Sequence, residues 1–228
     1  MKTMSQIAID GPAGVGKSTA AKNIAKMRNF MYVDTGAMYR TIGLACLNEG
    51  IDPNDEEKVS ECCARAEIDI KYIDGVQHMY LDGKDVSTDI RNEKVGKAAS
   101  DSSKFAAVRT RLVALQQDLG NKYDVVMDGR DIGTKVLVNA DLKVYLTATA
   151  ECRAMRRYKE LILKGEECCF EDIKKDIEER DRNDMTRALS PLCKAEDAIE
   201  IDTSDMTADE VAAEIIRLFE ETDGSNTR

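Results

Sequence analysis

The sequence predicts an α/β protein with a central parallel sheet flanked by helices, and three observations support this fold class. A strand at 6–10 runs through a glycine-rich turn into a helix at 17–28. Apolar strands and amphipathic helices then alternate along most of the chain. Two Asp-Gly turns within 68–90 are flanked by alternating apolar and polar residues, and such turns favour tight hairpins. This last segment therefore predicts a small antiparallel unit inserted into the parallel fold.

The other expected elements are, in order, a strand at 30–33, a helix at 36–49, a long helix at about 93–119 with a break near 100–104, strands at 124–127 and 142–146, a charged helical stretch at 151–184, a strand at 198–201 and a helix at 208–220. Gly50 and Pro53 end the helix that begins at 36. Because parallel strands need crossover connections, this alternation predicts helices on both faces of the sheet.

The composition fits a chain that can bury a substantial core. Of the 228 residues, 43% are hydrophobic and 33% are charged, and this length predicts one large domain or one domain with an insertion. The chain has 33 basic and 43 acidic residues, a formal net charge of −10. This balance argues against a nucleic-acid or membrane partner, because such binding surfaces are normally basic. A local basic pocket for a small anionic ligand remains compatible with it.

The cysteines and the short apolar runs predict a cytoplasmic protein. Apolar runs are far shorter than the about 20 residues that a membrane helix needs, and the first residues lack the apolar segment of a secretory signal. The seven cysteines form no C-x-x-C pair, and His78 is the single histidine. This pattern argues against a zinc site and favours reduced thiols.

A phosphate-binding loop follows the first strand. The segment from Gly11 to Ser18 matches G-x-x-x-x-G-K-[ST] in full. Its glycines let backbone N–H groups approach phosphates closely, and the following helix adds its positive dipole end. Lys17 is expected to reach the β- and γ-phosphates, and the Ser18 hydroxyl to ligate Mg²⁺. The expected triphosphate contacts are Gly11, Pro12, Ala13, Gly14, Val15, Gly16, Lys17, Ser18 and Thr19.

Two other classes of phosphate-loop protein agree less well with the sequence. Residues 121–124 fit the guanine-reading N-K-x-D pattern, but they follow an expected helix end, and no glycine has Asp three residues before it, as the GTPase D-x-x-G motif requires. A motor or multi-subunit ATPase would need a further module, and Asp128 is followed by Gly-Arg-Asp instead of a catalytic Glu. A small kinase, whose acceptor binds beside the γ-phosphate, remains.

Arginines near glycines indicate an acceptor that carries a phosphate. Arg40 ends Asp-Thr-Gly-Ala-Met-Tyr-Arg, and Arg130 lies within Asp-Gly-Arg-Asp-Ile-Gly-Thr. Arginine makes bidentate, permanently charged contacts with phosphate. With the phosphate loop and the segment 179–192, these motifs resemble the bacterial cytidylate (CMP) kinases, which are nucleoside monophosphate kinases. The resemblance extends over about residues 5–220, nearly the whole chain.

The resemblance implies transfer of the γ-phosphoryl group of ATP to CMP and dCMP, in pyrimidine nucleotide metabolism. It implies one P-loop kinase chain, 1–228, with a core at about 5–61, 101–150 and 185–220, a monophosphate-binding insertion at about 62–100 and a lid at about 151–184. It places Arg40, Arg130 and Arg187 at the CMP phosphate, Ser100, Arg109 and Asp131 at the cytosine, Arg180 and Asp184 at the ribose, and Thr35 near the sugar.

A physical argument supports the assignment of Asp131 to base recognition. Cytosine carries an amine where uracil carries a carbonyl, so a carboxylate accepts from the first and repels the second. Arg109 would donate to the acceptor edge of the base. Two assignments stay open at this point, because Ser102 and Ser103 lie close to Ser100, and Arg111 lies close to Arg109.

Neutralisation of phosphate charge is the expected mechanism. The acceptor phosphate is mostly ionised at neutral pH, so no general base is needed. The resemblance assigns Arg153 and Arg157 to ATP, with a hinge at Lys164-Gly165, and Asp128 to a Mg²⁺-bound water. The residues expected to neutralise the transferred group are Lys17, Arg130, Arg157 and Arg187.

Two alternatives to a CMP kinase remain. The first is a kinase for another small acceptor, such as UMP, AMP or a non-nucleotide. The second is a nucleotide-dependent regulatory protein that binds a partner instead of turning over an acceptor. The sequence contains no obvious coiled coil, and with the family pattern this favours a monomer.

Overall fold

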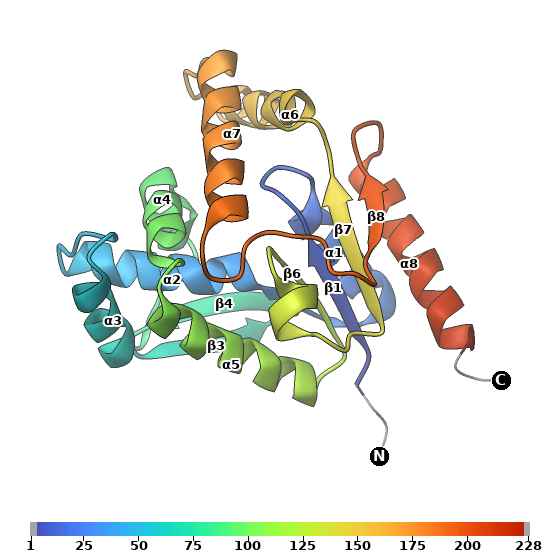
Figure 1. Cartoon of the computed structure of the whole chain (residues 1–228), viewed down its shortest axis with the longest axis horizontal. Helices are drawn as coiled ribbons and strands as arrows, with labels where there is room; N and C mark the ends of the chain where they lie inside the picture. Colours follow the sequence, from blue (N-terminus) through green and yellow to red (C-terminus); the bar gives the residue numbers. More distant parts are fainter. Residues whose placement is uncertain (1–3, 226–228) are drawn as a thin grey trace. The chain divides into compact units, whose positions relative to one another are not determined.

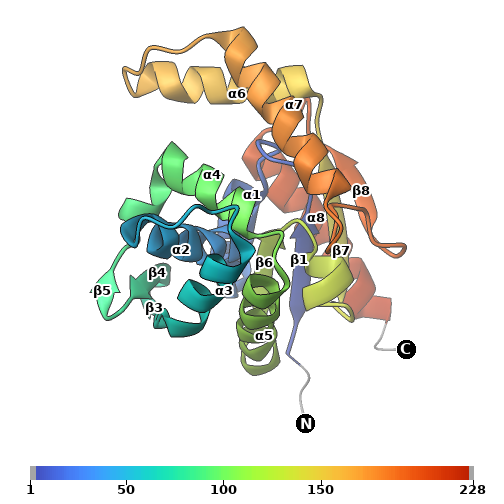
Figure 2. The same ribbon diagram turned by 60° about the vertical axis from the view of Figure 1, so that its left-hand side comes forward.

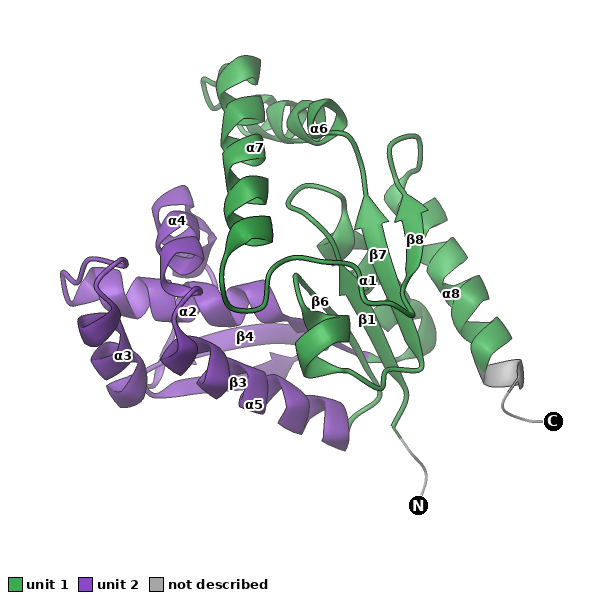
Figure 3. Cartoon of the chain, viewed as in Figure 1, with its two compact units in different colours: residues 1–30, 123–228 green, residues 31–122 purple. Residues whose placement is uncertain are grey.

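The computed structural model describes residues 4–225, which belong to two compact units (Figure 3). Unit 1 combines the chain up to residue 30 with the chain from residue 123 onward, and unit 2 comprises residues 31–122. The expected lid lies within unit 1, and the expected monophosphate-binding insertion lies within unit 2. Within the described part of the chain, no helix is both long and apolar enough to cross a bilayer.

Unit 1 contains a parallel sheet with the strand order β6-β1-β7-β8 (Figure 1). The first strand, β1 (Gln6–Asp10), pairs with β6 (Val125–Gly129) on one side and with β7 (Leu142–Thr147) on the other. β7 in turn pairs with β8 (Ile199–Asp202). Nearly all residues of β1, β6 and β7 are buried, as expected for parallel strands covered on both faces. The predicted α/β fold class is confirmed.

Helices α1 (Lys17–Arg28) and α8 (Ala208–Ser225) of unit 1 pack together (Figures 1 and 2). The rings of Phe30 and Phe219 meet edge to face with their centroids 5.8 Å apart. An amide–carboxylate hydrogen bond of 2.7 Å joins Asn23 to Asp209. These contacts join the two chain segments of unit 1, because α1 lies in the first segment and α8 in the second.

The charged stretch expected at 151–184 forms two helices, α6 (Ala150–Leu163) and α7 (Phe170–Thr186), which pack together (Figure 2). Thr149 caps α6, because its hydroxyl accepts a hydrogen bond from the Cys152 N–H at 3.1 Å. The chain leaves α6 at Gly165, whose φ of +75° is a conformation that favours glycine. The break therefore coincides with the predicted Lys164-Gly165 hinge position.

Unit 2 contains the predicted antiparallel sheet, with the strand order β3-β4-β5. Its strands are β3 (Ile68–Ile73), β4 (Val76–Leu81) and β5 (Lys84–Asp85). Asp74-Gly75 joins β3 to β4 and Asp82-Gly83 joins β4 to β5, and all four residues have positive φ. Positive φ at both central residues is the signature of the type I′ hairpin turn, so both predicted turns are confirmed.

Helices make up most of the remainder of unit 2. After β2 (Met31–Asp34) come α2 (Thr35–Asn48), α3 (Glu56–Arg65), the short 3₁₀ helix η1 (Asp89–Arg91), α4 (Glu93–Ser102) and α5 (Ala106–Lys122). The predicted break in the long helix is confirmed between α4 and α5. The sequence analysis missed α3, which Asp55 caps and which buries Val59 and Cys62. All seven cysteines are free thiols.

Candidate active site

The phosphate-binding loop lies in unit 1, between β1 and α1. Gly11 has a φ of +146°, and a Cβ there would stand 2.3 Å from the carbonyl oxygen of Leu146, so only glycine fits. The buried Lys17 ammonium donates to the Pro12 carbonyl at 2.6 Å. Burial lowers the pKa of Lys17 well below its ordinary value, and the nearby Arg130 cation lowers it further. This cluster of positive charge would bind an anion strongly.

The Ser18 hydroxyl and the Asp128 carboxylate lie next to each other. Ser18 Oγ donates a hydrogen bond to Asp128 Oδ2 at 2.8 Å, and Asp128 lies near the carboxyl end of β6. A hydroxyl and a carboxylate are hard oxygen donors of the kind that Mg²⁺ prefers, usually together with waters and substrate phosphates. The residues present therefore fit the predicted Mg²⁺ position.

Asp10, which the sequence analysis did not single out, joins β1 to the loop after β6. Its carboxylate accepts hydrogen bonds from the backbone N–H groups of Ile132 at 2.8 Å and Gly133 at 2.7 Å. Burial raises the pKa of Asp10 to about 6, although these two hydrogen bonds act in the opposite direction. The one feature of the sequence that could have pointed to Asp10 is its place as an acidic residue at the end of the first strand.

The predicted acceptor-binding residues of unit 1 form a buried ionic cluster. Arg130 Nε donates to Asp184 Oδ2 at 2.8 Å. Arg187 lies 3.8 Å from Asp184 and 3.9 Å from Asp131. Burial tends to raise the pKa of Asp184, but Arg130, Arg180 and Arg187 together bring it below its ordinary value. All five predicted residues in this part of unit 1 therefore lie close together, beside Lys17.

The two predicted lid arginines occupy different surroundings. Arg153 is buried at the start of α6 and donates to the carbonyls of Ala13 at 3.1 Å and Ala148 at 3.0 Å, and to the Asp181 carboxylate at 2.6 Å. It thereby joins the phosphate loop, α6 and α7. Arg157 is 41% exposed and pairs with Glu160 at 3.0 Å. The structure brings Arg153, but not Arg157, to the loop.

A pocket of about 280 Å³ adjoins the phosphate loop in unit 1. Its lining includes Gly16 and Thr19 from the start of α1 and its loop, together with Arg156 from α6 and Thr203 after β8. The Arg156 guanidinium donates to the Thr203 hydroxyl at 3.2 Å, and that hydroxyl also donates to the Val15 carbonyl at 3.0 Å. Sequence reasoning found the loop residues of this pocket but missed Arg156 and Thr203, because these lie far from the loop in the chain and match no motif.

Unit 2 carries the other predicted acceptor residues. Thr35 is buried at the first position of α2, and Arg40 lies one turn further along. Nη1 of Arg40 donates to the carbonyls of Ile90 at 3.0 Å and Asn92 at 3.1 Å. The guanidinium of Arg109 lies 5.7 Å from the centre of the Tyr39 ring. Arg109 of α5 therefore lies against Tyr39, which is next to Arg40 in α2.

The residues between which the sequence left two assignments open make contacts within unit 2. Arg111 donates to the carbonyls of Cys63 and Ala66, which lie at the end of α3, so its guanidinium is engaged in packing. The hydroxyls of Ser102 and Ser103 donate to carbonyls of their own helix turn. The Arg109 guanidinium likewise donates to the Ser103 carbonyl, at 3.4 Å, so the assignments of Arg109 and Ser100 stay predictions.

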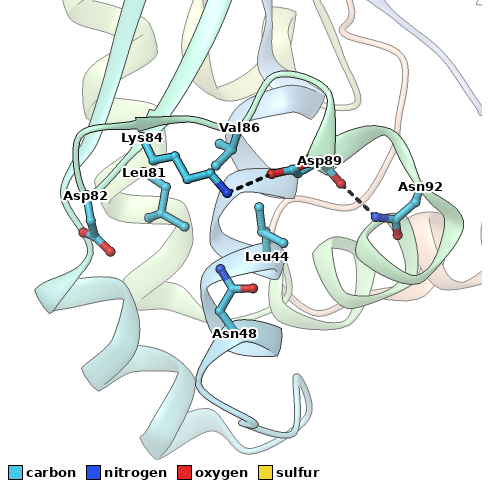
Figure 4. Close-up of a pocket in the computed structure, with 8 residues that line it drawn as sticks. All are labelled: Leu44, Asn48, Leu81, Asp82, Lys84, Val86, Asp89 and Asn92. Carbon is cyan, nitrogen blue, oxygen red and sulfur yellow. Dashed lines mark hydrogen bonds and ion pairs between the residues drawn. The ribbon is translucent and has the colours of Figure 1, made fainter.

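Unit 2 has a pocket of its own. Figure 4 shows this pocket, of about 510 Å³, between α2 and the β4–β5 hairpin, where Lys84 pairs with Asp89 at 3.5 Å. The pocket lining includes Leu44 and Asn92 but none of the predicted acceptor residues.

Comparison with known proteins agrees with this arrangement. The sequence profile of the family described as cytidylate kinase matches residues 7–221. The chain belongs to the cytidylate kinase family. The cytidylate kinase of Caldicellulosiruptor bescii is 50% identical over 93% of this chain and 94% of its own length. The cytidylate kinase of Bacillus subtilis is 45% identical over 97% of this chain and 99% of its own length.

A solved structure shares the fold of this family member. It is an uncharacterized protein from Eubacterium ventriosum, which is 13% identical, with a TM-score of 0.53 over 96% of this chain and 99% of that chain. At this identity the likeness concerns the fold alone. Membership of the cytidylate kinase family makes the protein an ATP-dependent nucleoside monophosphate kinase with nucleotides as substrates.

Proposed function

We propose that the protein transfers the γ-phosphoryl group of ATP to CMP and to dCMP, giving ADP and CDP or dCDP, in pyrimidine nucleotide metabolism. ATP is the co-substrate and Mg²⁺ the metal cofactor. The same proposal includes a monomeric state and a cytoplasmic location. The cytidylate kinase relatives, which match over nearly the whole chain, support the choice of CMP.

The positive charge around Lys17 is the observation that supports the proposal most directly. Lys17 and Arg130 are close enough for the Arg130 charge to lower the pKa of Lys17. Two cations that repel each other in a buried site are stabilised when a phosphate binds between them. Lys17 follows the nucleotide loop, whereas Arg130 follows β6. We infer that Arg130 and Arg187 bind the acceptor phosphate beside the γ-phosphate that Lys17 holds.

The remaining acceptor contacts follow the sequence assignments. In unit 1, Asp131 would accept from the cytosine amine, and Arg180 and Asp184 would hold the ribose. In unit 2, we assign Arg40 to the phosphate, Thr35 to the sugar, and Ser100 and Arg109 to the base. The cation–π contact of Arg109 with Tyr39 supports its placement, because it restricts where the guanidinium can lie.

The ATP side of the proposal uses the phosphate loop and its neighbouring pocket. Arg153 donates to the Ala13 carbonyl, so it holds the loop in shape, and Arg157 is exposed and would reach ATP when the lid helices move. The pocket beside Gly16 and Arg156 has room for part of a nucleobase and its sugar. We assign it to the adenosine end of ATP.

Positioning and charge neutralisation would account for catalysis. The acceptor phosphate is already ionised at neutral pH, so the site needs no general base. The Ser18 hydroxyl would ligate Mg²⁺, and Asp128 would hold one of its waters. When bound, the metal neutralises charge on the β- and γ-phosphates. Lys17, Arg130, Arg157 and Arg187 would stabilise the negative charge of the transferred group.

The experiment that tests the proposal measures ADP formation from ATP and Mg²⁺ with CMP, dCMP, UMP and AMP as separate acceptors. We expect strong activity with CMP and dCMP, weak activity with UMP, and loss of activity in a Lys17→Ala variant. Activity with only another acceptor would refute the assignment of Ser100, Arg109 and Asp131. No acceptor-dependent turnover would favour a nucleotide-dependent regulatory protein.

A further inference from the structure

Arg40 lies in a close-fitting cradle within unit 2, and Gly96 forms one wall of it. Two backbone carbonyls, those of Ile90 and Asn92, accept hydrogen bonds from Nη1 of Arg40. A Cβ atom added to Gly96 would stand 2.9 Å from both terminal nitrogens of Arg40 and 3.2 Å from its Cζ. Non-bonded heavy atoms of this kind prefer about 3.5 Å or more. The guanidinium therefore occupies space that any other side chain at 96 would fill.

Asn92 forms the part of the cradle next to Gly96, because its carbonyl also accepts a hydrogen bond from the Gly96 N–H at 3.1 Å. Its side-chain oxygen caps α4 by accepting from the Val95 N–H at 2.9 Å, and its side-chain nitrogen donates to the Asp89 carbonyl at 2.8 Å. These two bonds hold the backbone that presents the Asn92 carbonyl to Arg40. The arginine is thus held against the capped first turn of α4, where Gly96 leaves room for its guanidinium.

Glycine is an unfavourable residue inside a helix, so a buried glycine in α4 calls for a packing reason. We propose that Gly96 is a positioning residue for Arg40, which it keeps at the carbonyls of Ile90 and Asn92. Gly96 and Ser100 are four residues apart in α4 and share one face of the helix. The inference rests on the proposed role of Arg40 in binding the CMP phosphate and deepens it.

Gly43 provides a contrast within the same pair of helices. A Cβ atom there would stand 2.7 Å from the backbone nitrogen of Ala99 and 3.1 Å from the carbonyl oxygen of Val95. Those atoms belong to a rigid helix, whereas the atoms beside Gly96 end a flexible side chain. An alanine at 43 must therefore separate α2 from α4, but an alanine at 96 needs to displace only the guanidinium.

The test is a double-mutant cycle between positions 96 and 40, with Gly43→Ala as the comparison for helix separation. We would measure kcat, KM for CMP, KM for ATP and the melting temperature. Gly96→Ala is expected to raise KM for CMP about tenfold, with KM for ATP unchanged and the melting temperature equal or higher. In an Arg40→Ala background, the same change should alter KM for CMP by less than about twofold, because the interaction is already absent.

Two results would overturn the inference while leaving the proposed role of Arg40 intact. One is an equal loss from Gly96→Ala in both backgrounds, and the other is a melting temperature lowered as far as in Gly43→Ala. Either would mean that Gly96 serves helix packing. An Arg40→Ala variant with an unchanged KM for CMP would instead refute the role of Arg40, and the Gly96 inference with it.

Discussion

The Ser18 hydroxyl donates to the Asp128 carboxylate at 2.8 Å, although 110 positions separate the two residues in the chain. Ser18 lies in the first turn of α1, and Asp128 lies opposite Ile9 in the parallel pairing of β1 with β6. The turn after β1 therefore delivers the start of α1 to the carboxyl end of the neighbouring strand. This contact joins the nucleotide loop to the segment that carries Arg130 and Asp131.

Replacing Asp128 by Asn should weaken the use of Mg²⁺. The amide keeps the size and an acceptor for Ser18 but removes the negative charge that would hold a metal-bound water. We expect the Mg²⁺ concentration for half-maximal rate to rise by about tenfold or more, measured by titrating Mg²⁺ at saturating nucleotides. Asp141→Asn is the matched control, because Asp141 accepts from Gln6 at the opposite end of β1. An Mg²⁺ dependence equal to that of the control would contradict the assignment.

Replacing Asp131 by Ala should remove the discrimination between CMP and UMP. The buried carboxylate would accept from the cytosine amine and repel the uracil carbonyl. We expect kcat/KM to fall by about 10² or more for CMP and far less for UMP. Steady-state kinetics with the two acceptors measures the ratio directly. Equal losses for both would show that Asp131 maintains the structure and does not recognise the base.

Replacing Asp10 by Asn should change how stability depends on pH. Burial raises the pKa of Asp10 to about 6 in the folded protein, from 3.8. The folded state therefore binds the proton more tightly than the unfolded state, so the contribution of Asp10 is greatest at low pH and is lost as pH rises through about 6. The full difference corresponds to about 3 kcal/mol.

Urea unfolding of the wild type and of Asp10→Asn between about pH 4 and pH 7.5 measures this effect. The free energy of unfolding of the wild type, relative to the variant, should decline across that interval, because only the wild type titrates at this position. The amide also keeps one acceptor where the carboxylate has two, which should cost about 1–3 kcal/mol at all pH values. A pH-independent difference would mean that Asp10 stays charged throughout.

The two lid arginines should respond differently to truncation. Arg153→Ala removes three hydrogen bonds of a buried arginine, one of them to the Asp181 carboxylate, so the free energy of unfolding should fall by about 3 kcal/mol or more. Arg157→Ala breaks only an exposed ion pair and should change stability by less than about 1 kcal/mol. If Arg157 binds ATP, kcat should nevertheless fall. Chemical denaturation and steady-state kinetics on both variants separate the two roles.

Local residue patterns were enough to predict much of the fold. The two Asp-Gly turns, the strand before Gly11 and the alternation of later strands and helices depend on conformations of a few consecutive residues, and the structure confirms them. Helix α3 was missed because its charged, cysteine-containing sequence has few apolar positions. Its stability depends on Asp55 as a cap and on burial of Val59 against the other helices of unit 2.

The sequence by itself determined the phosphate loop, the α/β class and the family, because each depends on residues close together in the chain or on motifs in a fixed order. Only the tertiary structure decided which side chains meet. The contacts of Asp10 with the loop after β6, of Arg153 with the phosphate loop, and of Arg40 with Gly96 join residues far apart in sequence. Such contacts depend on strand pairing and helix packing, which no local pattern records.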